Sequence, residues 1–242
     1  MQIQIFQDEE SLHHAVAQTL IDAVKANPKV VLGLATGSSP LETYNNMMVD
    51  HLKNGTDYSG VVTFNLDEYV GLEGTHTQSY RYFMNTSLFN GLNIPLSQTN
   101  VPDGTGDLKE VCETYEAKIA KAGGIDLQLL GIGTNGHIGF NEPGTSFDTR
   151  THITELLQET IDGNARFFES AASVPKKAVT MGIQTIMDVK RVILIAYGSK
   201  KAAAIRDMVN GPVTESMPAS ILQKHQDVTL FLDEEAAALL KA

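Results

Sequence analysis

Cysteine is nearly absent from this sequence, which has Cys112 alone among its 242 residues. A single thiol excludes an intramolecular disulfide and a cysteine-based metal cluster, and it suits a reducing compartment. Apolar runs are short, and none approaches the roughly 18 residues that a membrane span requires. The first residues are polar and acidic, unlike a secretory signal peptide. These absences predict a cytoplasmic globular protein.

Basic residues are also few, with 18 lysines and arginines against 29 aspartates and glutamates and a formal net charge of -11. A nucleic-acid partner is therefore not expected, because no basic excess exists to neutralise phosphates. A small anionic substrate needs only a local positive site, so it stays possible. The length is ample for a sizeable core in one large domain or two small ones.

Strand-like apolar runs alternate with amphipathic helical patterns. Strands are expected at 2–6, 30–35, 61–65, 127–131, 191–197 and 228–232. Helices are expected at 9–26, 40–53, 107–122, 176–187, 199–209 and 234–241. This alternation is typical of an α/β fold with a mostly parallel sheet covered by helices on both faces. No repeat or linker divides the chain, which predicts a single domain over residues 1–242.

Small and polar residues follow three of the expected strands, at 36–39, 65–68 and 131–135. The carboxyl ends of strands in an open α/β sheet border the ligand crevice. We therefore expect these three segments to converge on one site.

The segment 130–144 is rich in glycine, and Gly131, Gly133 and Gly136 fit the G-x-G-x-x-G pattern of dinucleotide-binding proteins. That pattern must open a helix, whereas Gly139 and Pro143 would interrupt one here. The glycines therefore favour a backbone that a ligand approaches closely over a dinucleotide site.

The segment LGLATGSSPLETY has two interpretations. Ser39, Pro40 and Glu42 are typical of a capped helix start, with an N-cap, a first-turn proline and a capping-box glutamate. Alternatively, Gly37, Ser38 and Ser39 offer backbone N–H groups and hydroxyls to a phosphate.

Asp67 and Glu68 directly follow an apolar strand. Carboxylates at such a position are often only turn formers or helix caps. Asp67 is alternatively a candidate general base, and the adjacent charge of Glu68 would raise one of the two pKa values in a poorly solvated site.

His137 lies between glycines and five residues before Glu142. It is either a solvated loop histidine or a proton-transfer group oriented by that carboxylate. Asn135 either occupies a left-handed turn or binds a substrate hydroxyl. No second histidine lies at metal-ligating spacing, and His13 and His14 are expected to be exposed on a helix, so no metal site is predicted.

Two cations lie in polar contexts, Arg166 within NARFF and Lys201 within GSKKA. A lone cation is usually solvated on the surface. Beside a Ser/Thr-Gly loop, however, either one would complete a phosphate clamp. The pair Lys176–Lys177 is interpreted as a solvated helix face.

Several segments, in the same order along nearly the whole chain, resemble the glucosamine-6-phosphate deaminases of the isomerase type. The resemblance is carried by LGLATGSSP, VVTFNLDEYVGL, SYRYFMN, LLGIGTNGHIGFNEPGTSF, ARFF, VPKKAVTMGIQTI and GSKKA. Several motifs in register are far more specific than one alone. Sugar-phosphate lactonases share the fold and a glycine-rich signature, but NLDEYVGL together with NGHIGFNEP resembles the deaminases more closely.

The resemblance implies a Rossmann-like α/β domain that converts glucosamine 6-phosphate and water to fructose 6-phosphate and ammonia, with no cofactor or metal. Asp67 matches the base that moves the C2 proton to C1, and His137 matches the group that opens the pyranose ring. Glu142 and Asn135 match the partners of that histidine. The residues that match the sugar-phosphate contacts are Thr36, Gly37, Ser38, Ser39, Arg166 and Lys201.

The sequence departs from the family pattern in two respects. Asn135 stands where some members have aspartate, and an amide cannot accept a proton, so we expect it to orient His137 or the substrate. His152 and Thr154 occupy positions where allosteric members use basic residues to bind N-acetylglucosamine 6-phosphate. We therefore expect no such activation, and a monomer or small homo-oligomer. The segment 150–174 is the expected lid.

Two alternatives compete with the deaminase interpretation. A 6-phosphogluconolactonase-like enzyme on the same fold would turn over the lactone without releasing ammonia. A catalytically silent sugar-phosphate sensor would bind the ligand and raise the melting temperature without turnover. The intact set of Asp67, His137 and Glu142 favours an enzyme.

Overall fold

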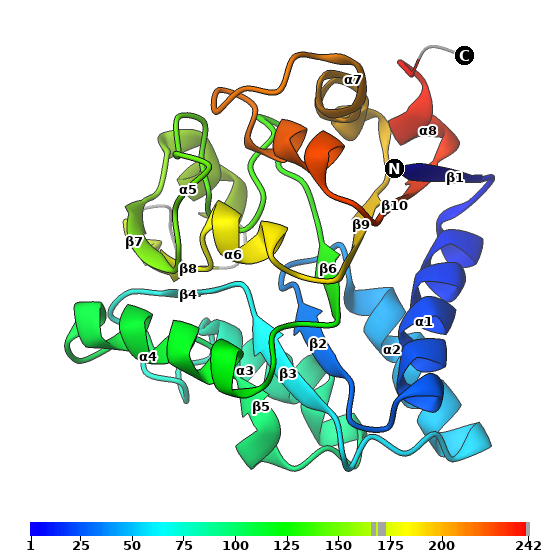
Figure 1. Ribbon diagram of the computed structural model, residues 1–242, viewed down its shortest axis with the longest axis vertical. Helices are drawn as coiled ribbons and strands as arrows, with labels where there is room; N and C mark the ends of the chain where they lie inside the picture. Colours follow the sequence, from blue (N-terminus) through cyan, green and yellow to red (C-terminus); the bar gives the residue numbers. More distant parts are fainter. Residues whose placement is uncertain (166–167, 169–172, 241–242) are drawn as a thin grey trace.

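A computed structural model describes residues 1–165, 168 and 173–240 of the chain. Within this described part, seven strands form one parallel sheet (Figure 1). In spatial order they are β1 (Gln2–Phe6), β10 (Val228–Asp233), β9 (Arg191–Ala196), β6 (Leu127–Leu130), β2 (Val31–Leu34), β3 (Val62–Asn65) and β5 (Thr99–Asn100). The predicted α/β class with a mostly parallel sheet is therefore confirmed.

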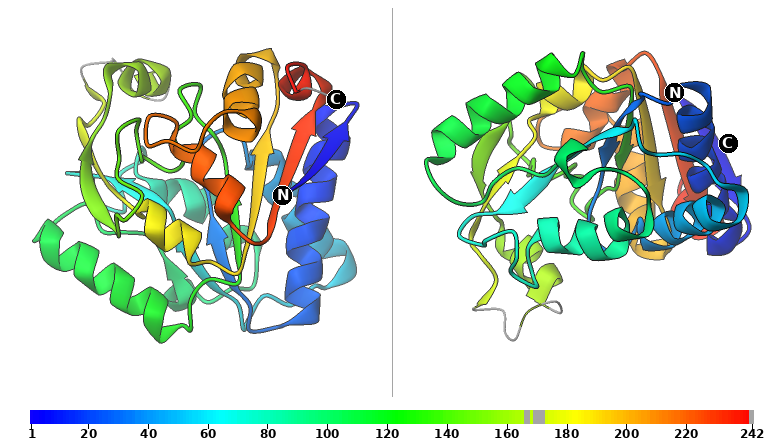
Figure 2. Two further views of the ribbon diagram at one scale, coloured as in Figure 1. Left: turned by 45° about the horizontal axis from the view of Figure 1, so that its top comes forward. Right: turned by 90° about the horizontal axis from the view of Figure 1, so that it is seen from below.

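Helices cover both faces of this sheet (Figures 1 and 2). Every residue of β2, β6 and β10 is buried, which requires packing on both sides. The covering helices are α1 (Glu9–Ala26), α2 (Leu41–Asn54), α3 (Tyr80–Ser87), α4 (Leu108–Lys121), α6 (Ile183–Met187), α7 (Ala202–Asn210) and α8 (Glu234–Ala237). Of the helices in the described residues, none is both long and apolar enough to cross a membrane.

The strand order reverses its direction of growth between β2 and β6. From β2 the chain proceeds through β3 to β5 on one side, and from β6 through β9 to β10 on the other. The crevice outside the carboxyl ends of strands at such a switch point is where open α/β sheets bind ligands.

The sequence patterns did not predict a second sheet, whose first strand follows β3 along the chain. Among the described residues it contains β4 (Asp67–Tyr69), β8 (Lys177–Thr180) and β7 (His152–Glu155), with β8 paired antiparallel to both neighbours. A separate apolar cluster, formed by Tyr69, Phe140, Leu156, Ile161, Val174 and Ala178, supports this sheet.

The helix expected at 176–187 is wrong in its first half. Lys177–Thr180 forms the central strand β8, and the helix is confined to Ile183–Met187. The two are separated at Gly182, where a Cβ would lie 2.2 Å from the backbone oxygen of Arg150. Lys176 and Lys177 are therefore exposed near the start of a strand and not on a helix face.

Two smaller expectations are also wrong. Helix α2 begins at Leu41, no side-chain hydrogen bond caps it from Pro40, and Glu42 accepts a hydrogen bond from Asn45 in place of closing a capping box. His13 is buried, with its Nδ1 3.0 Å from the Thr43 hydroxyl, because it lies on the face of α1 that packs beside α2. His14 is exposed as expected.

Candidate active site

Two adjoining cavities lie at the carboxyl ends of β2, β3 and β6. The larger has a volume of about 650 Å³ and the smaller about 160 Å³. Both are lined by Ser39, Ile132, Gly133 and His137, so they form one continuous crevice. The structure thus brings together the three polar segments that the sequence places after three strands.

Asp67 lines the smaller cavity together with Thr36 and Gly37. It is the first residue of β4 and is only 5% exposed. Burial raises the pKa of Asp67 to about 8, with a further contribution from the charge of Glu68, and a hydrogen bond with Thr36 opposes this rise. A carboxyl group that titrates near the working pH is well suited to accept and return a proton.

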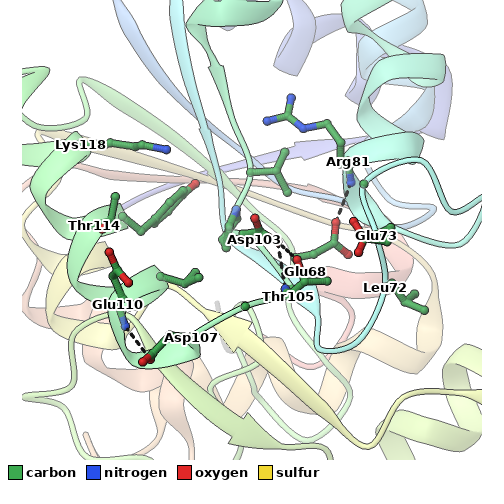
Figure 3. Close-up of a pocket in the computed structure, with 17 residues that line it drawn as sticks. Glu68, Leu72, Glu73, Arg81, Asp103, Thr105, Asp107, Glu110, Thr114 and Lys118 are labelled. Carbon is green, nitrogen blue, oxygen red and sulfur yellow. Dashed lines mark hydrogen bonds between the residues drawn. The ribbon is translucent and has the colours of Figure 1, made fainter.

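Glu68 points away from this crevice and has a structural role. Its carboxylate accepts hydrogen bonds from the backbone N–H groups of Tyr69, Tyr80 and Arg81, at 2.9, 2.8 and 2.9 Å. It therefore caps the first turn of α3, and the helix-cap interpretation applies to Glu68. Figure 3 shows it beside Arg81, lining a separate cavity of about 500 Å³.

Glu142 anchors a group of polar side chains around His137. Asn135 Nδ2 donates to Glu142 Oε2 at 3.0 Å, and Asn135 Oδ1 accepts from the backbone N–H of His137 at 3.1 Å. His137 Nδ1 lies 3.3 Å from Glu142 Oε2, which is within ion-pair distance. Thr160 donates its hydroxyl proton to Glu142 Oε1. The histidine therefore has an oriented carboxylate partner.

The pKa of Glu142 is below its ordinary value even though the side chain is 5% exposed. Burial by itself raises this pKa, but the interactions with His137, Thr160 and Asn135 together outweigh that effect. Glu142 is therefore ionised at neutral pH and presents a fixed negative charge to the imidazole.

Two glycines make room for this arrangement. A Cβ on Gly133 would lie 2.3 Å from Cε1 of His137, so the ring occupies space that only glycine leaves. Gly136 has a φ of +86°, which favours glycine. The described residues between Leu130 and His152 form turns and loops, not the helix that a dinucleotide fingerprint requires.

Thr180 connects the two sides of the crevice. It is the residue of β8 that pairs with Asp67 across the small sheet. Its hydroxyl also accepts a hydrogen bond of 3.0 Å from the backbone N–H of Phe140, in the loop that contains His137 and Glu142.

The residues expected to contact a phosphate lie along the same crevice. Gly37 has a φ of +87°, Ser38 and Ser39 line the larger cavity, and Thr36 lines the smaller one. Lys201 lines the larger cavity and donates to the backbone oxygen of Ile132 at 2.5 Å. The remaining member of this set, Arg166, lies outside the described residues.

Thr160 is a site residue that the sequence patterns missed. It belongs to α5 (Gln158–Asn164), within the expected lid, and its contact with Glu142 spans 18 positions. No local periodicity signals such a contact. In the part of the chain that the structure describes, no group of three or more His, Cys, Asp or Glu side chains could hold a metal ion.

Comparison with known proteins identifies relatives over the full chain. Residues 7–231 match the family model described as glucosamine-6-phosphate isomerases/6-phosphogluconolactonase. A glucosamine-6-phosphate deaminase of Clostridium perfringens is 48% identical over 242 residues, which is all of both chains. Another from a Geobacillus species is 50% identical over 232 residues, covering 96% of this chain and 92% of the relative.

Solved structures agree with these relatives. A structure described as a monomeric glucosamine-6-phosphate deaminase superposes with a TM-score of 0.97 at 44% identity, covering 99% of this chain and all of the other. A 6-phosphogluconolactonase from Trypanosoma brucei gives a TM-score of 0.77 at 21% identity, covering 99% of this chain and 98% of the other, a likeness of fold alone.

Proposed function

Because the chain belongs to the family of glucosamine-6-phosphate isomerases and 6-phosphogluconolactonases, and its full-length relatives are deaminases, we infer that it is a glucosamine-6-phosphate deaminase. It converts glucosamine 6-phosphate and water to fructose 6-phosphate and ammonia. The observation that carries this function is that Asp67 and His137 line the same cavity. The pKa of Asp67 is raised, and His137 is paired with Glu142. The lactonase alternative shares the family model, but the solved lactonase from Trypanosoma brucei is only 21% identical, against 44–50% for the deaminases.

We propose that His137 opens the pyranose ring. Ring opening removes the proton of the C1 hydroxyl and delivers a proton to the ring oxygen, and one imidazole can perform both transfers. Glu142 holds the ring of His137 in position and stabilises the imidazolium that forms between the two transfers. Asn135 fixes the shared Glu142 oxygen and the backbone of His137, which is an orienting role that an amide can fill.

We propose that Asp67 then acts on the open-chain aldose. Its carboxylate accepts the proton from C2 while the C2 ammonium group gives a proton to the carbonyl oxygen on C1, which forms an enolamine. Asp67 then returns its proton to C1, which leaves a protonated imine at C2. Water adds to that imine and ammonia leaves, so C2 becomes the ketone carbon of fructose 6-phosphate. Apart from this water molecule, the proposed steps use side chains and the substrate's own groups.

The phosphate is proposed to lie against Thr36, Gly37, Ser38 and Ser39, with Lys201 and Arg166 as its cations. Thr36 and the serines line the crevice on the side of β2, and Lys201 approaches from the start of α7. Binding energy from this remote group positions C1 and C2 against Asp67 and His137. Free glucosamine is expected to turn over far more slowly.

The test of this function is an ammonia-coupled assay with glucosamine 6-phosphate. The wild-type protein releases ammonia, and Asp67→Asn loses at least about 100-fold in kcat, the usual range for removing a general base. Turnover of 6-phosphogluconolactone without ammonia release would instead establish the lactonase. Full activity of Asp67→Asn at preserved folding would overturn the assignment of the base.

We further propose that residues 1–242 act as one cytoplasmic domain, in a monomer or small homo-oligomer without allosteric activation. The proposed lid is 150–174, of which 166, 167 and 169–172 lie outside the described residues. His152 and Thr154 lack the basic groups of allosteric members, and His152 Nδ1 is 2.9 Å from the backbone oxygen of Arg150. The 44% identical solved relative is described as monomeric. A sigmoidal rate curve that N-acetylglucosamine 6-phosphate makes hyperbolic would contradict this proposal.

A further inference from the structure

The first turn of α5 reaches across the larger cavity to the loop that contains His137. Glu159 Oε1 accepts a hydrogen bond of 2.9 Å from the Thr134 hydroxyl. The next residue, Thr160, donates its hydroxyl proton to Glu142 Oε1. Two adjacent residues of one helical turn therefore hold two points of the same loop, and one of these points is the carboxylate beside the catalytic histidine.

The two oxygens of Glu142 have separate partners. Oε2 is shared by Asn135 and His137, whereas Oε1 accepts a hydrogen bond from the Thr160 hydroxyl. A carboxylate that is held through one oxygen alone can rotate about its terminal torsion. A hydrogen bond to the second oxygen fixes the carboxylate plane and thus the direction in which Oε2 faces the imidazole.

Burial makes this contact hard to replace. Thr160 is 7% exposed and Glu142 is 5% exposed, so water has little access to Glu142 Oε1, the acceptor of the hydrogen bond from Thr160. A buried carboxylate oxygen that loses its donor is strongly destabilised, and the side chain then moves or takes up a proton.

We propose that Thr160 is a positioning residue for ring opening, acting through the orientation of the Glu142 carboxylate toward His137. This inference rests on the proposed function and deepens it, because it assigns to α5 a part in the first proton transfer. The alternative is a merely structural contact, since Ile161, the next residue of α5, packs in the apolar cluster beneath the small sheet.

The test compares Thr160→Val, which keeps the shape and removes the hydroxyl, with Thr160→Ser, which keeps the hydroxyl. Thr160→Val is expected to lose roughly tenfold or more in kcat at nearly unchanged KM, and Thr160→Ser to stay within about threefold of wild type. Binding of the open-chain amine 2-amino-2-deoxyglucitol 6-phosphate needs no ring opening. Its inhibition constant is therefore expected to stay the same in all three proteins.

Thr134→Val is the matched control, because it removes the other hydroxyl that joins α5 to the loop and leaves Glu142 untouched. A ¹³C NMR titration of the Glu142 carboxyl measures its pKa and so tests the contact between Thr160 and Glu142 independently of enzyme activity. Its midpoint is expected to rise in Thr160→Val, since a hydrogen bond that lowers the pKa of Glu142 is lost, and to stay in place in Thr134→Val.

Wild-type kcat together with a wild-type Glu142 midpoint in Thr160→Val would overturn the inference. So would a parallel loss of analogue binding and kcat, which indicates damage to the fold. Absence of ammonia release from the wild-type protein, with the midpoint still shifted in Thr160→Val, would instead overturn the proposed function and leave the contact established.

Discussion

Asp67 and Glu68 are neighbours in β4, yet their carboxyl groups serve opposite sides of that strand. Asp67 faces the crevice beside Thr36, whereas Glu68 binds the backbone N–H groups at the start of α3. Successive side chains of a strand alternate between its two faces. One dipeptide therefore supplies both the candidate base, Asp67, and the carboxylate of Glu68 that holds the start of α3 against β4. The charge of Glu68 also helps to raise the pKa of Asp67.

The first prediction concerns the pH dependence of the wild-type enzyme. Asp67 has to be ionised to accept the C2 proton, and its pKa is raised to about 8. We expect kcat/KM to rise with pH, to reach half of its plateau near pH 8 and to level off above that pH. A profile of ammonia release against pH checks this, and a limb with its midpoint near the ordinary value of about 4 for aspartate would contradict it.

The second prediction is that Glu68→Gln moves this limb to lower pH. The substitution removes a neighbouring negative charge, while burial, the larger cause of the raised pKa, remains. The control is Glu73→Gln, which removes an exposed charge from the cavity that Glu68 also lines. The limb is expected at the wild-type position in Glu73→Gln, and an equal shift in both variants would argue against the short-range effect.

The third prediction is that Asp67→Asn stabilises the fold. The pKa of Asp67 is higher in the folded protein than the value of 3.8 for an unperturbed group, so the wild type loses stability as pH rises from about 4 to about 8. The asparagine variant does not titrate. Its free energy of unfolding is therefore expected to exceed that of wild type by a growing margin, on the order of a few kcal/mol at pH 8.

Urea unfolding of the two proteins at pH 5 and pH 8 measures this margin. All other titrating groups are common to both proteins, so the difference between them isolates Asp67. A margin that is the same at the two pH values would show that Asp67 has no raised pKa.

The fourth prediction is that Gly133→Ala displaces the imidazole of His137. The new Cβ would lie 2.3 Å from Cε1 of the ring, so the ring has to move, and kcat is expected to fall roughly tenfold or more at preserved folding. Gly131→Ala is the comparison, because no described atom outside its chain neighbours lies within 4 Å of its added Cβ. Comparable losses in the two variants would mean that the effect is not due to the ring of His137.

Six strands of the large sheet were predictable because most of them are rich in apolar residues. The edge strand β5, Thr99–Asn100, consists of two polar residues and was missed. The segments 127–130 and 191–196 are recognisable as strands because they are mostly apolar. The small and polar residues that follow 31–34 and 127–130 indicate a ligand-binding crevice. Asp67, His137, Glu142 and Asn135 could be selected because chemically active side chains are conspicuous beside such strands.

The small sheet was not predictable because its strands contain three or four residues and are stabilised by partners distant in sequence. Asp67–Tyr69 has no strand pattern of its own, and the apolar spacing of 176–187 fits a helix until Gly182 and the pairing on both sides of β8 are known. Thr160 was missed for the same reason, since its importance depends on a contact with Glu142, which is distant in sequence.

Thr180 links the two proposed proton-transfer groups, Asp67 and His137, through one residue of β8. Because it pairs with Asp67 and its hydroxyl binds the loop of His137, a displacement of β8 carries both sides of the crevice together. We expect these two contacts to limit changes in the spacing between the two groups. In the proposed mechanism, an open-chain sugar held by its phosphate would then pass from His137 to Asp67 without leaving the crevice.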